Sequence, residues 1–139
     1  MSTTKMYRDQ HAELVEVIQD IADKLDPTSL ANGGATEATA LLKVLAGKLL
    51  LHLAAEDKHL YPNLITSTDS ELATTAKQFQ DEMGGLKGAF QAYYGKWNTP
   101  EAVQGDPAGF IEHTQGVFEA LGTRVEKENT VLYPLADRL

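Results

Sequence analysis

The sequence predicts an all-α protein whose four helices form an up-down-up-down four-helix bundle. Four stretches carry apolar residues at intervals of three and four, the spacing that places them on one face of a helix. Proline and glycine punctuate the segments between these stretches, and the connections are short or moderate in length, which favours antiparallel neighbours. No stretch shows the sustained alternation of a β-strand.

The first two helices are expected at about residues 4–25 and 36–60. The first should end at Asp26-Pro27, because proline cannot continue a helix. Asn32-Gly33-Gly34 is a strong break before the second helix. The second helix should close near Tyr61-Pro62 for the same reason as the first.

The third helix is expected to run from Asp69 or Ser70, either of which can cap its start, to about Trp97. Gly84-Gly85 weakens the helix propensity at its centre. The fourth helix is expected over about residues 107–133. The stripe of the third helix alternates steps of four and three, as in shallow-angle helix packing. Its members are Leu72, Ala76, Phe79, Met83, Leu86, Phe90, Tyr93 and Trp97.

Length and composition bound the class of protein. With 139 residues, the chain has the usual length of a single domain, which we expect to span residues 1–139. It carries 12 basic and 20 acidic residues, a net charge of −8, whereas nucleic acids and anionic membranes attract clustered positive charge. The absence of cysteine excludes disulfides, zinc–thiolate sites and iron–sulfur clusters. The sequence shows neither a signal-peptide run nor a stretch approaching roughly 18–20 apolar residues. We therefore expect a cytoplasmic protein with no nucleic-acid or membrane partner.

The second and fourth helices end in related sequences. Leu60-Tyr61-Pro62 recurs 72 residues later as Leu132-Tyr133-Pro134. The chain therefore looks like two related helical hairpins. The other pairs that correspond under this offset are Glu56 with Glu128 and His52 with Arg124.

Ionisable residues interrupt the apolar faces of these helices. A buried charged group must be paired, neutralised or bound to a metal. In the first helix, His11 begins the apolar stripe. The expected inward series of the second helix is Leu41, Leu45, Leu49, His52, Glu56 and His59. That of the fourth helix is Phe110, His113, Val117, Leu121, Arg124, Glu128, Val131 and Leu135.

The predicted topology brings several of these residues to one level. In an antiparallel bundle, the start of the first helix lies beside the end of the second, and the internal repeat places the end of the fourth at the matching level. The third helix runs through that level at its centre. The residues expected to meet in one end of the bundle interior are His11, His52, Glu56, Met83, Arg124 and Glu128.

This pattern resembles the hemerythrin-like, or HHE cation-binding, family over essentially the whole chain. The resemblance is carried by a histidine that opens the first helix, by His-x-x-x-Glu followed by Leu-Tyr-Pro on the second, and by a glutamate followed by Leu-Tyr-Pro on the fourth. It implies a non-heme metal site inside the bundle, commonly di-iron, and roles that involve oxygen, nitric oxide, peroxide or iron. The positions that match the metal ligands of the family are His11, His52, Glu56 and Glu128.

Two positions depart from the family pattern, so the resemblance implies a degenerate site. The third-helix histidine of the family falls at Met83, preceded by Glu82, and the fourth-helix histidine is replaced by Arg124. A thioether is a poor ligand for iron, and a guanidinium has no lone pair and keeps its charge. A second cation close to Arg124 would be repelled in a low-dielectric interior. One bound ion is therefore favoured over two.

Two other histidines have weaker claims on the site. His59 lies three residues after the second-helix glutamate, a Glu-x-x-His spacing that ferritin-like di-iron bundles use twice but that occurs here once. We expect it at the end of the core and count it, with Glu82, Met83 and Arg124, as a candidate pocket residue. His113 precedes Arg124 by 11 residues, about 16 Å along a helix, and should lie outside the site.

Two hypotheses about function stay open at this point. In the first, the protein binds a metal ion, with iron as the candidate, for redox or small-gas sensing or iron handling; its partners are then the ion and a small gas or oxygen species. In the second, it is a metal-free structural or interaction module in which Arg124 forms salt bridges with Glu56 and Glu128. Neither hypothesis assigns a catalysed reaction, and both are compatible with a homodimer.

Overall fold

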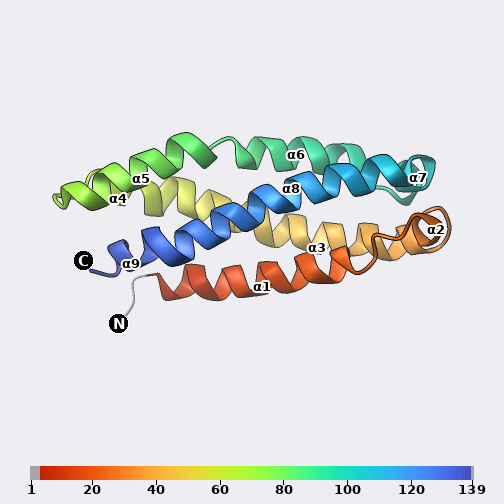
Figure 1. Cartoon of the computed structure of the whole chain (residues 1–139), viewed down its shortest axis with the longest axis horizontal. Helices are drawn as coiled ribbons and strands as arrows, with labels where there is room; N and C mark the ends of the chain where they lie inside the picture. Colours follow the sequence, from red (N-terminus) through yellow and green to blue (C-terminus); the bar gives the residue numbers. More distant parts are fainter. Residues whose placement is uncertain (1–3, 139) are drawn as a thin grey trace.

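The computed structural model describes residues 4–138, and it confirms the predicted all-α bundle. Four long helical stretches run antiparallel, and both ends of the chain lie at the same end of the bundle (Figure 1). Residues 1–3 and residue 139 lie outside the described part. The first three residues belong to the N-terminal stretch in which no signal peptide was expected. The elements, two of them π-helical turns labelled η, are α1 (Lys5–Ala22), α2 (Pro27–Leu30), α3 (Gly34–Ala55), η1 (Glu56–Leu60), α4 (Tyr61–Ile65), α5 (Ser70–Met83), α6 (Leu86–Trp97), α7 (Pro100–Gly105), α8 (Pro107–Lys127), η2 (Glu128–Leu132) and α9 (Tyr133–Ala136).

Aspartate caps fix where several helices begin. The side chain of Asp69 accepts hydrogen bonds from two backbone N–H groups in the first turn of α5, at 3.1 and 3.2 Å, so Asp69 rather than Ser70 is the cap. Asp106 caps α8 in the same way and is followed by a proline, whose fixed φ suits the first helical position. The same Asp-Pro start at Asp26 produces the short helix α2 inside a segment that we predicted to be an irregular connection.

The third predicted helix is divided into α5 and α6 at Gly84-Gly85, and the division is visible in Figure 1. The last turn of α5 is tight, because a Cβ at Gly84 would lie 2.6 Å from the backbone oxygen of Gln80. The inward stripe nevertheless continues across the break: its members are buried except Met83, which is half-buried. The glycine pair therefore bends the path of the third helical stretch without changing the face that it buries.

Two π-helical turns, each starting at a glutamate, change the register of the second and fourth helical stretches. The N–H groups of Tyr61 and Tyr133 bond the carbonyls of Glu56 and Glu128, five residues earlier. Each tyrosine precedes a proline, which has no N–H to continue the ordinary ladder and whose ring would clash with the carbonyl four residues back. The wide turn relieves that conflict and moves the buried face by one residue.

This shift corrects the end of both predicted inward series. His59 and Val131 are exposed and Leu135 is half-buried, while Leu60 and Leu132 take the buried positions. The predicted spacing was wrong there because it assumed 3.6 residues per turn throughout. The shift occurs at equivalent places in both halves, so the 72-residue sequence repeat is also a structural repeat.

The core consists of two apolar clusters with a polar layer between them. One cluster contains Leu14, Leu53, Leu86 and Leu121 and fills the long part of the bundle. The other surrounds Phe79 at the end where the termini lie, and its remaining buried members are Tyr7, Leu60, Tyr61, Leu64, Leu72, Ala76, Leu132, Tyr133 and Ala136. On each helical stretch, the predicted site residue lies between a member of one cluster and a member of the other. Apolar side chains therefore seal the polar layer on both sides.

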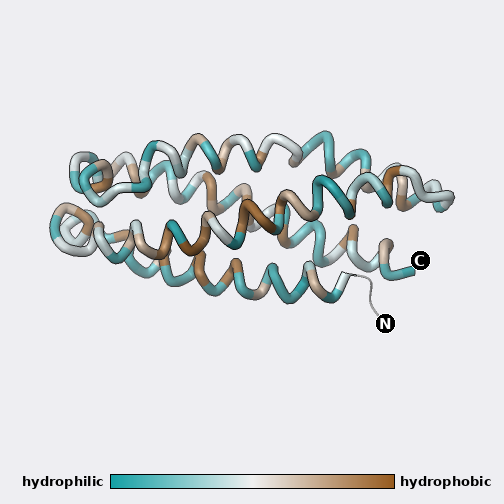
Figure 2. Tube along the Cα trace, turned by 180° about the vertical axis from the view of Figure 1, so that it is seen from behind, coloured by the Kyte–Doolittle hydropathy of each residue, from teal (hydrophilic) through white to brown (hydrophobic). Residues whose placement is uncertain are grey.

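One helical segment is long and apolar enough to cross a membrane, so the expectation that no stretch approaches a membrane span was wrong on these two criteria. The segment Gly34–Ile65 is 32 residues long and contains an 18-residue window of mean hydropathy 1.5. Hydrophobic residues run along α3 in Figure 2. Within the bundle, 44% of that window is buried, and the segment also carries His52 and Glu56 into the polar layer. Because the core helix of a soluble bundle passes the same test, this one helix is weak evidence for a membrane span.

Candidate metal centre

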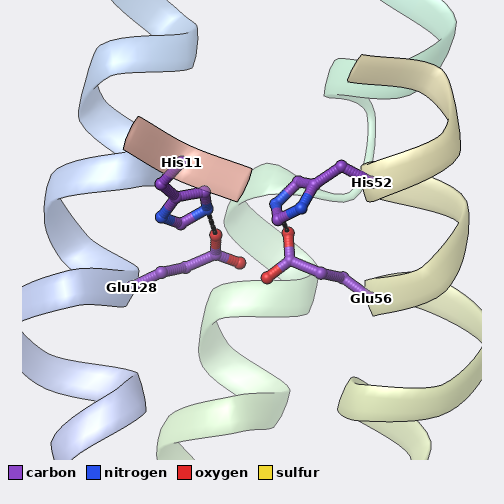
Figure 3. Close-up of side chains that lie close together, drawn as sticks. All are labelled: His11, His52, Glu56 and Glu128. Carbon is purple, nitrogen blue, oxygen red and sulfur yellow. Dashed lines mark ion pairs between the residues drawn. The ribbon is translucent and has the colours of Figure 1, made fainter. Parts of the chain in front are cut away.

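Four buried side chains from three helical stretches converge in the polar layer. Their exposed fractions are at most 3%. Each residue offers one nitrogen or oxygen atom, and these four atoms lie within 4.8 Å of one another. Figure 3 shows the two imidazoles and the two carboxylates pointing toward a common centre. The residues are His11 on α1, His52 on α3, Glu56 at the start of η1 and Glu128 at the start of η2. The structure thus assembles the set that the resemblance implied.

Each histidine is oriented by an amide oxygen that binds its outer nitrogen. The Nδ1 atom of His11 lies 2.9 Å from the side-chain oxygen of Asn129, and the Nδ1 atom of His52 lies 2.6 Å from that of Gln10. An amide oxygen accepts, so each Nδ1 carries the proton and donates it. This is the arrangement of a metal-ligating histidine, whose second ring nitrogen is left to face the ion.

Within residues 4–138, the inner nitrogen of His52 finds no hydrogen-bond partner. Its Nε2 atom is buried and lies 2.9 Å from Oε1 of Glu56, a contact that does not form a hydrogen bond. Burial lowers the pKa of His52 to about 4, and this effect outweighs the opposite influence of Glu128. The ring is therefore neutral at neutral pH, with an unshared lone pair that faces a carboxylate oxygen. Such a contact in a dry interior is favourable only where a proton or a cation lies near both atoms.

The two carboxylates are held by tyrosines in a reciprocal pattern. The hydroxyl of Tyr61 donates to Oε2 of Glu128 at 2.6 Å, and the hydroxyl of Tyr133 donates to Oε2 of Glu56 at 2.6 Å. Each half of the internal repeat therefore orients the glutamate of the other half. Burial, reinforced by the charge of Glu128, raises the pKa of both phenols, so they remain hydrogen-bond donors.

The two glutamates titrate differently. Burial and the charge of Glu128 raise the pKa of Glu56 well above its usual range. Burial acts in the same direction on Glu128, but the charge of Arg124 and the hydrogen bond from Tyr61 oppose it, and the pKa is lowered to about 2. Two carboxylates this close in a dry interior do not both ionise. The pair therefore resists full ionisation, and a metal cation beside it would relieve that cost.

Arg124 is the fixed positive charge of the layer. It is 3% exposed; its Nε atom lies 3.3 Å from Oε2 of Glu128 and its Nη2 atom 3.4 Å from Oε1 of Glu56. The same Nη2 atom lies 3.3 Å from the half-buried carboxylate of Asp57. Burial by itself would lower the pKa of Arg124, but the two carboxylates raise it, so the guanidinium stays charged. Sequence position alone predicted this residue as a candidate pocket member, and the structure places it there.

The other candidate pocket residues lie differently. The backbone oxygen of Met83 reaches the polar layer and lies 3.4 Å from Nη1 of Arg124. The side chain of Met83 packs against the apolar cluster that surrounds Phe79. Glu82 is exposed and pairs with Lys127 at 3.3 Å, while His59 is turned to solvent by the π-helical turn. Both were wrong as pocket residues. His113 is outside the site, as predicted: its Nδ1 atom accepts a hydrogen bond from the indole of a tryptophan on α6 at 2.9 Å.

Sequence reasoning did not assign a role to the residues that orient the site. These are Gln10, Asp57, Tyr61, Asn129 and Tyr133. A signal for the tyrosines was present, because the Leu-Tyr-Pro repeat places a tyrosine five residues after each inward glutamate. Gln10 and Asn129 adjoin His11 and Glu128 in sequence, but only the packing of α1 against η2 and α3 shows which rings they bind.

The low pKa of His52 predicts a pH-dependent stability. The folded-state pKa is about 4, below the ordinary histidine pKa of 6.5, so between these values the unfolded chain takes up a proton that the folded chain does not. The stability is fully present above pH 6.5, is lost as pH falls towards 4, and the loss from this group amounts to about 3 kcal/mol.

Urea unfolding of chelator-treated protein between pH 7 and 4 measures this dependence. A His52→Gln variant should show a shallower fall in unfolding free energy over that range than the unmodified chain. The matched control is His59→Gln, which removes an exposed histidine. Equal slopes for the unmodified chain and His52→Gln would contradict the assignment of the pH dependence to His52.

The donor set suits a transition-metal ion. It combines two imidazole nitrogens with carboxylate oxygens, which iron, zinc and manganese accept. The buried nitrogen of His52 and the two closely placed carboxylates both fit a site built around a cation.

Comparison with known proteins agrees with this geometry. The family model of the hemerythrin HHE cation-binding domain matches residues 2–136 of the chain. No curated protein and no solved structure matches significantly.

Proposed function

The chain belongs to the hemerythrin HHE cation-binding family, and from this premise we propose that it binds one transition-metal ion, with iron as the candidate, for redox or small-gas sensing or iron handling. The proposed ligands are His11, His52, Glu56 and Glu128. The observation that carries the proposal is the buried, partnerless Nε2 atom of His52, which faces a carboxylate oxygen at 2.9 Å.

The choice of one ion rests on Arg124. Its guanidinium lies within 3.4 Å of an oxygen of each glutamate, so it would adjoin any second ion held by this pair. A permanent cation at that position repels another cation, and the dry interior strengthens the repulsion. The positive charge of Arg124 also favours the approach of an anionic or electron-rich oxygen species.

When bound, the ion would supply a redox-active, Lewis-acidic centre. The chain's own residues prepare the site for it. Tyr61 and Tyr133 fix the carboxylates, Gln10 and Asn129 fix the imidazoles, and the two apolar clusters limit access of water to the layer.

Metal analysis of protein purified from iron- and zinc-supplemented cells tests the proposal. We expect about one ion per chain, because the site has one set of free donor atoms. Glu128→Gln should lower the affinity by at least about tenfold, as loss of a ligand or its support does, whereas Glu119→Gln, an exposed glutamate on the same helix, should not. No metal after supplementation would contradict the proposal, and two ions would contradict the part assigned to Arg124.

The second candidate function is a metal-free structural or interaction module. It is favoured by one observation, the contacts of Arg124 with Glu56 and Glu128, which already provide the carboxylates with a positive charge. In that case the network serves to specify the core, and the protein should be equally stable with and without added metal. A thermal unfolding experiment with and without Fe(II) or Zn(II) separates the two functions, since an ion that binds only the folded state raises the melting temperature.

A further inference from the structure

The two glutamates divide the polar layer into two sides. Oε1 of Glu56 and Oε2 of Glu128 face Arg124, at 3.4 and 3.3 Å. The other two oxygens, Oε2 of Glu56 and Oε1 of Glu128, face Tyr133, at 2.6 and 3.4 Å. Each glutamate therefore turns one oxygen toward Arg124 and the other toward Tyr133. On the Arg124 side, Nε2 of His52 lies 2.9 Å from Oε1 of Glu56, and on the Tyr133 side, Nε2 of His11 lies 3.1 Å from Oε1 of Glu128.

The hydroxyl of Tyr133 lies among the donor atoms on its side of the carboxylate pair. Besides the two carboxylate oxygens, it lies 3.2 Å from Nε2 of His11, and that nitrogen is 3.1 Å from Oε1 of Glu128. Adjacent ligands at about 2.1 Å from one octahedral ion are separated by about 3 Å. The hydrogen-bond separations around the Tyr133 oxygen, from 2.6 to 3.4 Å, are also compatible with atoms that bind one ion.

The ring of Tyr133 is held in this place by its surroundings. It is 0% exposed and stacks on His11, with ring centroids 5.3 Å apart and an interplanar angle of 23°. The guanidinium of Arg8 lies over the ring, 5.3 Å from its centroid. The backbone is fixed as well, because the residue follows η2 directly. The hydroxyl consequently needs little movement to bind an ion.

We propose that Tyr133 is a further metal ligand, which binds through its phenolate oxygen on the side of the carboxylate pair opposite Arg124. This inference rests on the proposed function. Coordination breaks the phenolic O–H bond: the oxygen lone pair forms the bond to the ion, and the proton is released to solvent. An ion of charge two or three stabilises the phenolate that burial otherwise disfavours.

The internal repeat supplies a matched control in Tyr61. It occupies the same place in its half of the chain and is equally buried, at 1%. Its hydroxyl also donates to a site glutamate at 2.6 Å, but to the Glu128 oxygen on the Arg124 side. Tyr61→Phe therefore removes an equivalent hydrogen bond without removing the proposed ligand.

The test compares unmodified protein, Tyr133→Phe and Tyr61→Phe after loading with Fe(III). A phenolate bound to Fe(III) gives a charge-transfer absorption band in the visible and resonance-enhanced ring vibrations in the Raman spectrum. We expect both signals in the unmodified protein and in Tyr61→Phe, and neither in Tyr133→Phe. The affinity of Tyr133→Phe for Fe(III) should also be about 10–100-fold weaker than that of the unmodified protein.

The outcomes separate this inference from the function on which it rests. Unmodified protein that binds iron without the phenolate signals overturns ligation by Tyr133 and leaves metal binding standing. Signals that persist in Tyr133→Phe, or disappear in Tyr61→Phe alone, also overturn it. Unmodified protein that binds no metal overturns both. If Tyr133→Phe fails to fold by circular dichroism, the Raman spectrum of the unmodified protein and of Tyr61→Phe decides the question.

Discussion

Replacement of Arg124 by alanine is expected to lower the unfolding free energy of the metal-free protein by about 3–5 kcal/mol. The guanidinium is 3% exposed, and it is the charged partner of Glu56 and Glu128, both 0% exposed. Without it, the ionised carboxylate of the pair would be left buried beside its neighbour, which is far costlier than loss of a surface ion pair. The loss should be smaller at low pH, where both carboxyls are protonated.

Urea unfolding of chelator-treated protein measures this change. Lys127→Ala is the matched control, because this residue is also basic and also on α8, but its side chain is 45% exposed and pairs with a surface glutamate. Its removal should cost at most about 1 kcal/mol. A change of only a few tenths of a kcal/mol for Arg124→Ala would show that the guanidinium is solvated and would remove the physical basis of the metal-free alternative.

Arg124→His is expected to raise the bound iron from about one ion per chain to about two. Position 124 corresponds to His52 under the 72-residue repeat, and its side chain lies between the two glutamate oxygens that face away from Tyr133. The substitution replaces a permanent cation by an imidazole with a lone pair. Both obstacles to a second ion, repulsion and a missing ligand, are removed together.

Iron analysis after anaerobic loading gives the stoichiometry, and titration with Fe(II) gives the affinity. Arg124→Lys is the control, since it keeps a positive charge at the same position and should stay at about one ion. Unchanged stoichiometry and affinity in Arg124→His would mean that the Arg124 side lacks the geometry of a second metal position.

The fold was predictable because its signals are local. Apolar spacing gave the four helical stretches, and prolines and aspartates gave most of their ends. The stripe from Leu72 to Trp97 is buried as predicted except at Met83, although the helix that carries it is broken. The break at Gly84-Gly85 was visible as weak propensity, but propensity does not say whether a helix bends or continues.

The orientation of the site was less predictable, since it depends on departures from regular geometry. The π-helical turns move His59 outward and bring Tyr61 and Tyr133 inward. A prediction that assumes 3.6 residues per turn does not account for the extra residue in a π-helical turn. Glu82 was assigned to the pocket from its place beside Met83, but the helix turns its side chain to Lys127.

Residue chemistry and spacing by themselves determined the class of the bundle, because it follows from patterns within single helices and from one repeat. The resemblance that those motifs carry pointed to the family and to four residues that the structure brings together. The three-dimensional packing alone decided which oxygen faces which partner: it set Arg124 on one side of the carboxylates and Tyr133 on the other. Those contacts join residues up to 77 positions apart, and distances of this kind are fixed only when helices from different parts of the chain pack against one another.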